Sequence, residues 1–441
     1  MRPETLSEIL NSFSGDHPAL SLSSELISAR RLLDEADDLY QRSFVSQSSR
    51  IALCALAPKA LVSALVAFDG KVEAMLLLPA SLDEATIDQL VIAAGCTHAM
   101  NADGVRALPN CHFVCGSSDH VSTQWLLATS GTTGTPKLIA HRLSTLTSSV
   151  KRDRARGRGF VWGLLYDPSR FAGLQVILQA LFSGAQLVVS QPNKFEVQLD
   201  AFVRHRINAL SATPSLWRKM LMDGRIKNCP LQQITLGGEI ADQQILDALR
   251  RCFPAARVVH IYASTEAGIA FAVDDCQAGF SVAWLQGEDS PIPLRIRDDG
   301  HLLIRPSKLP GGSEIVRRLD ADGYLDTEDL VRVEGDRVLF LGRASGAINV
   351  GGNKVMPEAV EQHIRCVGGV LDVRVFGKKS SIMGQLVAAE VVAGPEVDVV
   401  ALRAEILSHC RSHLEKWQIP GLISFVDQLQ ENMAGKRVRL I

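Results

Sequence analysis

The stretch TSGTTGTPK at residues 129–137 combines glycines, hydroxyl side chains and one lysine in a way that suits a polyphosphate. Glycine lets backbone N–H groups approach anionic oxygens closely, and successive N–H groups form an anion-binding nest. The hydroxyls add hydrogen-bond donors, and the lysine adds a positive charge. A flexible surface loop is the alternative that this stretch alone leaves open. The predicted phosphate-binding residues are Thr129, Ser130, Gly131, Thr132, Thr133, Gly134 and Lys137.

The spacing of this loop differs from that of the P-loop, GxxxxGK[ST]. Thr135 and Pro136 separate Gly134 from Lys137, and no serine or threonine follows the lysine. A Walker-type NTPase, which would release phosphate from ATP without a carboxylic acid, is therefore disfavoured.

A second group of reactive side chains comprises Cys111, His112, Cys115 and His120. Their spacing matches no zinc-binding pattern, and no second cysteine pair follows them. We therefore expect no metal at this segment. The nine cysteines of the chain are scattered and odd in number, which indicates reduced thiols and a cytoplasmic protein.

The elements that must position these residues alternate along the chain. Short β-branched runs at 185–190, 207–213 and 232–238 are each followed by an amphipathic helical stretch, at 194–206, 214–225 and 242–253. This alternation predicts an α/β fold with parallel strands. From about residue 280 the pattern changes to short strands joined by Asp-Gly and Glu-Gly turns, which predicts a β-rich part.

The segment from Gly342 to Gly346 predicts a domain boundary, because a compact αβ stretch follows it. We expect a large N-terminal domain, 1–341, and a small mobile C-terminal α+β domain of ordinary domain size, 342–441. The net charge of −2 offers no electrostatic basis for binding nucleic acid or an anionic membrane. The N-terminus lacks the apolar segment of a signal peptide, and no apolar run is long enough to span a membrane.

Taken in order, the motifs resemble those of the adenylate-forming superfamily, which includes acyl- and aryl-CoA synthetases, stand-alone adenylation domains and luciferases. The resemblance covers most of the chain and rests on the order of the motifs, since each one alone is weak. The matching stretches are TSGTTGTPK (129–137), LGGEI (236–240), YASTEAG (262–268), GYLDTEDL (323–330), GRASGAINVGGNKVMPEAVE (342–361) and NMAGKRVR (432–439).

The resemblance implies that a carboxylate attacks the α-phosphate of ATP and forms an acyl-adenylate and pyrophosphate, after which a thiol displaces AMP. In such a site, the loop at 129–137 would hold the β- and γ-phosphates. Thr265 would bind the α-phosphate, and Glu266 would hold Mg²⁺, which prefers carboxylate and phosphate oxygens. The nucleotide base and ribose would contact Gly237, Gly238, Glu239, Tyr262, Asp329 and Arg343.

The resemblance also implies a catalytic lysine on the mobile C-terminal domain. Lys436 would contact the carboxylate and the α-phosphate as charge develops, so the predicted catalytic residues are Lys436, Thr265 and Glu266. For thioester formation the domain would rotate about a hinge near Ser345 and present Gly351 and Gly352 to a pantetheine arm.

The favoured acceptor is CoA, which makes the chain an AMP-forming acid–CoA ligase. The alternative acceptor is the phosphopantetheine of a separate acyl or peptidyl carrier protein, since no carrier domain follows Lys436. A non-catalytic binding protein of the same fold is less consistent with the joint presence of Lys137, Glu266, Asp329 and Lys436.

The acid is expected to be small, with an apolar and aromatic or aliphatic tail. Four places depart from the family pattern. Arg170 replaces a histidine, Glu328 replaces the glycine before the ribose aspartate, and Ser345 replaces an aspartate or lysine at the hinge. Gln430 and Glu431 stand where the terminal motif normally opens with proline and a basic residue. These departures leave the acid and the thiol acceptor open. The predicted acid pocket is lined by Arg170, Phe171, Ala172, Gly173, Gly268 and Ile269.

Overall fold

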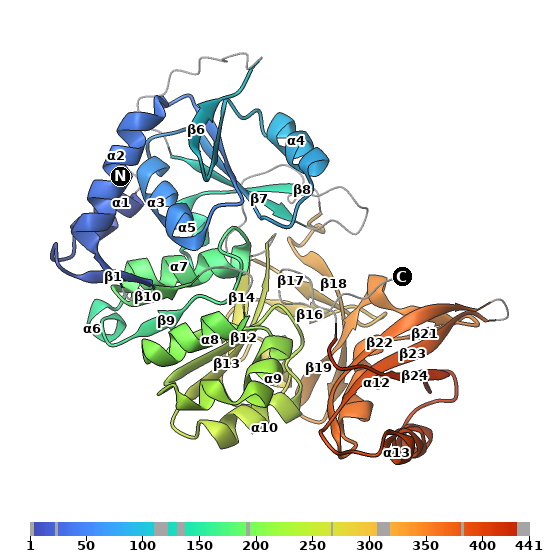
Figure 1. Ribbon diagram of the computed structural model, residues 1–441. Helices are drawn as coiled ribbons and strands as arrows, with labels where there is room; N and C mark the ends of the chain where they lie inside the picture. Colours follow the sequence, from blue (N-terminus) through green and yellow to red (C-terminus); the bar gives the residue numbers. More distant parts are fainter. Residues whose placement is uncertain are drawn as a thin grey trace.

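The computed structural model describes residues 4–22, 25–109, 122–129, 137–190, 195–265, 268–306, 318–380 and 383–429. The strands of these segments form four sheets. Figure 1 shows an upper α/β unit, a second α/β unit below it, a β-rich region beside the second, and a C-terminal unit at the lower right. The predicted α/β fold with a β-rich part is therefore confirmed.

The upper unit contains a sheet with the strand order β6-β5-β3-β4-β7-β8. Its central strand β4 (Ala74–Leu78) has the sequence AMLLL and is buried along its whole length, as expected of a parallel strand covered on both faces. The other elements are β3 (Arg50–Cys54), β5 (His98–Asn101), β6 (Gly104–Ala107), β7 (Gln124–Thr129), β8 (Lys137–His141), α2 (Ala29–Ser43), α3 (Pro58–Phe68) and α4 (Glu84–Ala93).

The second unit contains a sheet with the order β14-β13-β12-β11-β9-β10-β1-β2. Its middle strands β11 (Ala209–Ala212), β12 (Gln233–Gly237) and β13 (Arg257–Ser264) pair in parallel. The connecting helices α9 (Pro214–Asp223) and α10 (Gln243–Cys252) begin after Thr213 and Asp242, whose side chains accept hydrogen bonds from the first turn.

The remaining strands of this unit are β1 (Pro18–Leu22), β2 (Glu25–Ser28), β9 (Val161–Gly163), β10 (Gln186–Val189) and β14 (Gly268–Val273). Its remaining helices are α6 (Arg154–Gly157), α7 (Phe171–Ser183), α8 (Phe195–Arg204) and the 3₁₀ helix η1 (Arg225–Asn228). α1 (Leu6–Asn11) packs against α2 and α3 of the upper unit as well as against α7, and α5 (Leu143–Leu146) follows β8.

The order in which the chain adds strands to this sheet reverses beside β9, although the strands stay parallel. From β9 the chain passes through α7 to β10 on one side, whereas β11, β12 and β13 follow one another on the other side. β9 pairs in parallel with both β10 and β11. Open parallel sheets bind ligands at the carboxyl ends of the strands where such a reversal occurs. The segments after β9 and β11 are therefore the expected place for a ligand.

The β-rich region has the strand order β15-β19-β18-β17-β16 and its own apolar cluster around Phe271, Phe280 and Val338. Gly335 lies in the tight turn between β18 and β19 with φ +60, which is the left-handed conformation that glycine adopts at little cost. The elements are β15 (Phe280–Ser281), η2 (Val282–Gln286), β16 (Leu294–Ile296), β17 (His301–Ile304), β18 (Leu325–Glu334) and β19 (Arg337–Arg343).

The C-terminal unit follows the 3₁₀ turn η3 (Ala344–Gly346) and contains a separate apolar core, whose residues include Ile348, Val375 and Ile423. The division into 1–341 and 342–441 stays a prediction. The elements of this unit are β20 (Ile348–Val350), β21 (Asn353–Val355), α12 (Pro357–Arg365), β22 (Val370–Ser380), β23 (Gly384–Ala393), α13 (Val399–His413) and β24 (Leu422–Phe425).

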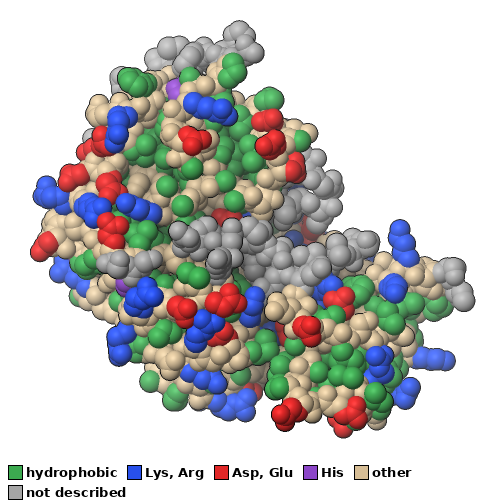
Figure 2. Space-filling view, viewed as in Figure 1, with side chains coloured by type: hydrophobic (Ala, Val, Ile, Leu, Met, Phe, Trp, Pro, Cys, Tyr) green, Lys and Arg blue, Asp and Glu red, His purple; other side chains and the backbone are tan. Residues whose placement is uncertain are grey.

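Figure 2 shows acidic and basic side chains interspersed over the visible face, in keeping with the net charge of −2. Of the helices that the structure describes, none combines the length and the apolar character needed to cross a membrane.

Candidate nucleotide and acid site

Two of the predicted motifs meet at one edge of the second sheet. Ala212, Gly237 and Ser264 end the neighbouring parallel strands β11, β12 and β13, so the segments that follow them lie next to one another. The sequence places the predicted adenine segment after β12 and the predicted α-phosphate and Mg²⁺ residues after β13. The strand order of the fold thus brings these predicted nucleotide contacts to a common edge.

The predicted adenine segment is held by two contacts from residues that follow β9 and β11. Tyr166, which follows β9, donates from its hydroxyl to the Gly237 carbonyl at 3.3 Å. The backbone N–H of Ser215, in the first turn of α9, donates to Glu239 Oε2 at 3.0 Å. Gly238 between them has φ +83, which favours glycine. These contacts fix the course of residues 237–239.

Tyr166 is a site residue that the sequence reasoning missed. Its side chain is buried, and burial raises the pKa of its phenol, so the hydroxyl stays protonated and remains a donor to Gly237. A tyrosine that follows a short apolar strand carries no local signal of such a contact, because its partner lies 71 residues away.

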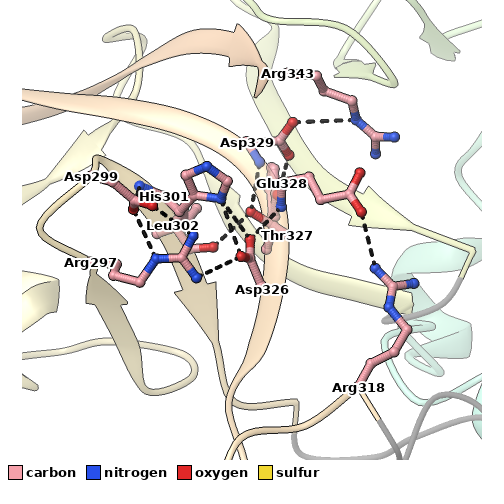
Figure 3. Close-up of polar contacts among 11 residues, drawn as sticks. Arg297, Asp299, His301, Leu302, Arg318, Asp326, Thr327, Glu328, Asp329 and Arg343 are labelled. Carbon is pink, nitrogen blue, oxygen red and sulfur yellow. Dashed lines mark hydrogen bonds and ion pairs between the residues drawn. The ribbon is translucent and has the colours of Figure 1, made fainter. Parts of the chain in front are cut away.

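Asp329 on β18 lies between two partners that were also predicted to bind the nucleotide. The hydroxyl of Tyr262, on β13, donates to Asp329 Oδ2. Arg343 Nε lies 3.4 Å from Asp329 Oδ1 (Figure 3). Asp329 and Arg343 are paired residues of the neighbouring strands β18 and β19. The structure therefore brings Tyr262, Asp329 and Arg343 together. Their binding of base and ribose stays a prediction.

Burial governs the ionisation of this group. It raises the pKa of Asp329, and the Tyr262 hydroxyl and the Arg343 guanidinium act in the opposite direction. Burial and the neighbouring Asp329 carboxylate raise the pKa of Tyr262 well above its usual range. The Tyr262 ring also stacks with Phe271 and Phe340, at centroid distances of 5.1 Å in both cases. These contacts fix the Asp329 carboxylate, whose two oxygens are hydrogen-bond acceptors, where the second sheet meets the β-rich region.

Glu328, which replaces the family glycine before Asp329, keeps a glycine-like backbone. Its φ is +63, in the left-handed region that costs a residue with a side chain about 1–2 kcal/mol. The Asp326 carboxylate accepts a hydrogen bond from the Glu328 N–H at 2.8 Å, and Glu328 Oε1 lies 3.6 Å from Arg318 Nη2 (Figure 3). His301 and Arg297 hold Asp326 in turn, at 3.0 and 2.8 Å.

We expect Glu328→Gly to leave the free energy of unfolding unchanged or to raise it by up to about 1 kcal/mol. Glycine removes the backbone strain, while the half-exposed ion pair with Arg318 contributes little. Glu328→Val should lower stability by about 1 kcal/mol or more, since a β-branched residue tolerates positive φ poorly. Denaturant unfolding of the three proteins measures this order. Valine at least as stable as glycine would contradict the assigned strain.

The predicted phosphate loop connects two antiparallel strands. Thr129 at the end of β7 pairs with Lys137 at the start of β8, and Lys137 is exposed. A P-loop instead runs from a strand into a helix, so the local structure agrees with the rejection of the Walker pattern. Five predicted phosphate contacts lie outside the residues that the structure describes: Ser130, Gly131, Thr132, Thr133 and Gly134.

The predicted α-phosphate residue Thr265 stands at the turn between β13 and β14, where Ser264 pairs with Gly268. Glu266, the predicted Mg²⁺ ligand, lies outside the described residues, as do Lys436 and the cysteine and histidine segment at 111–120. Within the described part of the chain, no group of three His, Cys, Asp or Glu side chains gathers in a way that could hold a metal ion.

The predicted acid-pocket residues Arg170 and Phe171 lie where the chain leaves β9 and enters α7. Arg170 Nη2 donates to Ser81 Oγ at 3.1 Å, and its Nε is buried without a hydrogen-bond partner. The Phe171 ring lies 5.9 Å from that of His141, at the end of β8. The segment thus faces the upper sheet at the reversal point beside β9.

The other four pocket residues differ in their surroundings. A Cβ on Gly173 would come within 2.2 Å of the Asp167 carbonyl oxygen, so glycine is needed there for packing. Gly268 faces open space and has φ +69, and the neighbouring Ile269 is half-buried. Ala172 is exposed. Their contact with an acid stays a prediction.

Gly351 and Gly352 form the two-residue turn between β20 and β21, with φ +57 and +92. Two positive φ values are the signature of a type I′ hairpin turn, which explains both glycines locally. That these glycines also let a pantetheine arm pass stays a prediction.

Two family models match the chain: one described as AMP-binding enzyme over residues 79–292, and one described as AMP-binding enzyme C-terminal domain over residues 359–436. A probable 2-succinylbenzoate–CoA ligase of Mycobacterium tuberculosis is 30% identical over 334 residues, which cover 70% of this chain and 81% of the relative. The chain belongs to the adenylate-forming family of AMP-binding enzymes. The expected family is confirmed.

This AMP-binding enzyme also resembles a 3-[(3aS,4S,7aS)-7a-methyl-1,5-dioxo-octahydro-1H-inden-4-yl]propanoyl:CoA ligase of Mycobacterium tuberculosis. That relative is 28% identical over 375 residues, which cover 81% of this chain and 71% of the relative.

Two solved structures share the fold. The anthranilate CoA ligase AuaEII in complex with anthranoyl-AMP has a TM-score of 0.79 at 17% identity and covers 98% of this chain and 95% of its own. The o-succinylbenzoate CoA synthetase of Bacillus subtilis, in complex with its acyl-adenylate OSB-AMP, has a TM-score of 0.73 at 17% identity and covers 100% and 98%. The predicted large N-terminal and small C-terminal organisation is thereby confirmed at the level of the fold.

Proposed function

We propose that this enzyme, an ATP-dependent, AMP-forming acid–CoA ligase, acts on a carboxylic acid with a ring and a second polar group. Three of the relatives and structural neighbours have names with ring-bearing acids: succinylbenzoate, anthranilate and a dioxo-octahydroindenyl propanoate. The observation that carries the proposal is the pairing of an apolar ring, Phe171, with a cation, Arg170, beside the reversal point of the sheet.

Arg170 has the features of a substrate contact. Its Nε is buried without a hydrogen-bond partner, and its ion-pair distance to Asp167 Oδ2 is 3.9 Å, at the limit of a direct contact. A buried donor without a partner costs free energy, which a carboxylate or carbonyl oxygen of the substrate would recover. Phe171 next to it offers an apolar surface for a ring. We therefore assign Arg170 to the polar group of the acid that does not react.

The site also includes Mg²⁺ at Glu266 and the ATP phosphates at Lys137 and its loop. This assignment rests on the family motifs and on the chemistry of carboxylate and phosphate ligands. Tyr262, Asp329 and Arg343 are assigned to the base and ribose, because their contacts place one largely buried carboxylate beside two donors.

The function is tested by ATP–pyrophosphate exchange with a panel of acids that includes benzoate, 2-succinylbenzoate, anthranilate, phenylpropanoate and octanoate. We expect exchange to depend on an added acid and to be fastest with a ring-bearing acid. Thioester formation with free CoA and with a phosphopantetheinylated carrier protein should then favour CoA. Exchange without any acid, or none with every acid, would contradict the proposal.

Arg170→Ala is expected to change the order of acids in this panel. The acid with a second carboxylate or carbonyl should lose about tenfold or more in kcat/KM, as one charge-assisted hydrogen bond is lost, while benzoate should change little. Arg411→Ala, an exposed arginine on α13, is the control. An unchanged order of acids would show that Arg170 only packs against Ser81 and Asp167.

A further inference from the structure

A buried group of charged side chains joins the C-terminal unit to the second α/β unit. Arg365, the last residue of α12, donates from Nη1 to Asp242 Oδ2 at 3.2 Å, and the same oxygen accepts a hydrogen bond from Arg218 on α9. The side chains of these residues are only 8%, 9% and 10% exposed. The next residue makes a second contact between the two units: Gln244 Nε2, on α10, donates to Cys366 Sγ at 3.3 Å.

Each side of this contact has its own counter-charge. Within the C-terminal unit, Arg365 Nη2 lies 3.1 Å from Glu361 Oε2, and its Nε lies 3.7 Å from Asp372 Oδ1. Within the second α/β unit, Asp242 keeps Arg218 and also accepts from the Ile245 N–H at 3.1 Å. Removing one partner from a buried ion pair is costly when it leaves an unpaired charge. Here separation of the two units leaves no charge unpaired, so the contact suits repeated opening.

The contact is continuous with the predicted adenine segment. Asp242 follows Glu239 by three positions, and Glu239 accepts the N–H of Ser215 in the same helix that carries Arg218. A nucleotide bound against residues 237–239 would therefore contact the segment that leads into the surface against which Arg365 packs. The hairpin with Gly351 and Gly352 lies on the outer side of the C-terminal unit, away from β12 and β13 (Figure 1).

We propose that Asp242 and Arg365 are positioning residues that hold the C-terminal unit in the arrangement for adenylate formation, and that their ion pair sets how the enzyme divides between its two half-reactions. This rests on the proposed acid–CoA ligase function. The direction follows from the hairpin, because β21, which follows the two glycines predicted to admit the thiol, lies away from β12 and β13 in this arrangement (Figure 1).

Asp242→Asn is the sharpest test. Asparagine keeps the shape and the ability to accept from Ile245, so α10 keeps its N-cap, but the charge that attracts Arg218 and Arg365 is lost. ATP–pyrophosphate exchange should fall about tenfold, within the range by which positioning residues change coupling. Thioester formation from the pre-made adenylate of the best panel acid should stay within about twofold of wild type or rise.

Two controls separate this role from a purely structural one. Asp247→Asn, on the exposed face of the same helix, should change neither half-reaction. Arg365→Lys keeps a positive charge beside Glu361 and Asp372, but a single ammonium cannot reproduce the guanidinium fork that also reaches Asp242. It should give the same imbalance as Asp242→Asn, with no further loss in the double variant. Equal loss of both half-reactions in Asp242→Asn, or additive losses in the double variant, would overturn the proposal.

Small-angle X-ray scattering of the enzyme without ligands gives a readout that does not depend on activity. Asp242→Asn should have a larger radius of gyration than wild type, and an unchanged radius would overturn the proposal. If wild type shows no exchange with any acid but the scattering difference is present, the ligase proposal fails and the contact between the units stands.

Discussion

Lys436→Ala should lose adenylate formation by about a hundredfold or more, the size expected for one lost electrostatic donor in a closed site. The lysine lies outside the described residues, and its role is predicted from the motif NMAGKRVR. Its charge would act while the carboxylate attacks the α-phosphate, and the attack of the thiol would not use it. ATP–pyrophosphate exchange measures the first step, and thioester formation from a pre-made acyl-adenylate measures the second.

The matched control is Lys416→Ala, which removes an exposed lysine from the same C-terminal unit. This variant should leave both steps close to wild type. If Lys436→Ala lowered both steps by the same factor, the lysine would not be restricted to adenylation, and the expected alternation of the C-terminal unit would lose its main support.

Ser345→Pro is expected to keep pyrophosphate exchange near wild type while thioester formation falls by orders of magnitude. Ser345 is the middle residue of the turn η3, in which the Ala347 N–H donates to the Ala344 carbonyl at 3.4 Å. Proline fixes φ near the value of such a turn, and it also restricts Ala344 before it. Rotation about the predicted hinge should therefore be blocked. The arrangement expected to be trapped is the one for adenylate formation, because it would bring Lys436 to ATP.

Ser345→Ala is the control for this change, because it removes the hydroxyl and leaves the backbone free. Thermal unfolding of both variants shows whether the fold survives, and only a folded proline variant is informative. Full thioester output from a folded Ser345→Pro enzyme would place the hinge elsewhere or exclude rotation as a step of the reaction.

The turn at Gly351 and Gly352 illustrates what could be read from local sequence. Two glycines between short β-branched runs favour a tight hairpin, since both positions require positive φ. The same holds for the alternating strands and helices around β11, β12 and β13, where hydrophobic period and capping residues act within one element. The order of the family motifs added the reaction, which no single stretch could have indicated.

Glu328 shows where local sequence was misleading on its own. Its residue type argues against a left-handed backbone, yet φ is +63 because Asp326 holds its N–H and Asp329 must face Tyr262. The surrounding strand pairing imposes this conformation, so the propensity of one residue could not have revealed it.

The sequence by itself determined the α/β class and the membership in a family that forms adenylates, and it predicted that Lys137 and its loop bind phosphate. Only the tertiary structure decided that Tyr262 meets Asp329 across 67 positions, that Tyr166 holds Gly237 across 71, and that Arg365 reaches Asp242 across 123. Helices, turns and loops depend on neighbours within a few residues, which the sequence displays directly. Contacts between distant residues depend on strand order and on the packing of whole units, and these become visible only when the chain is folded.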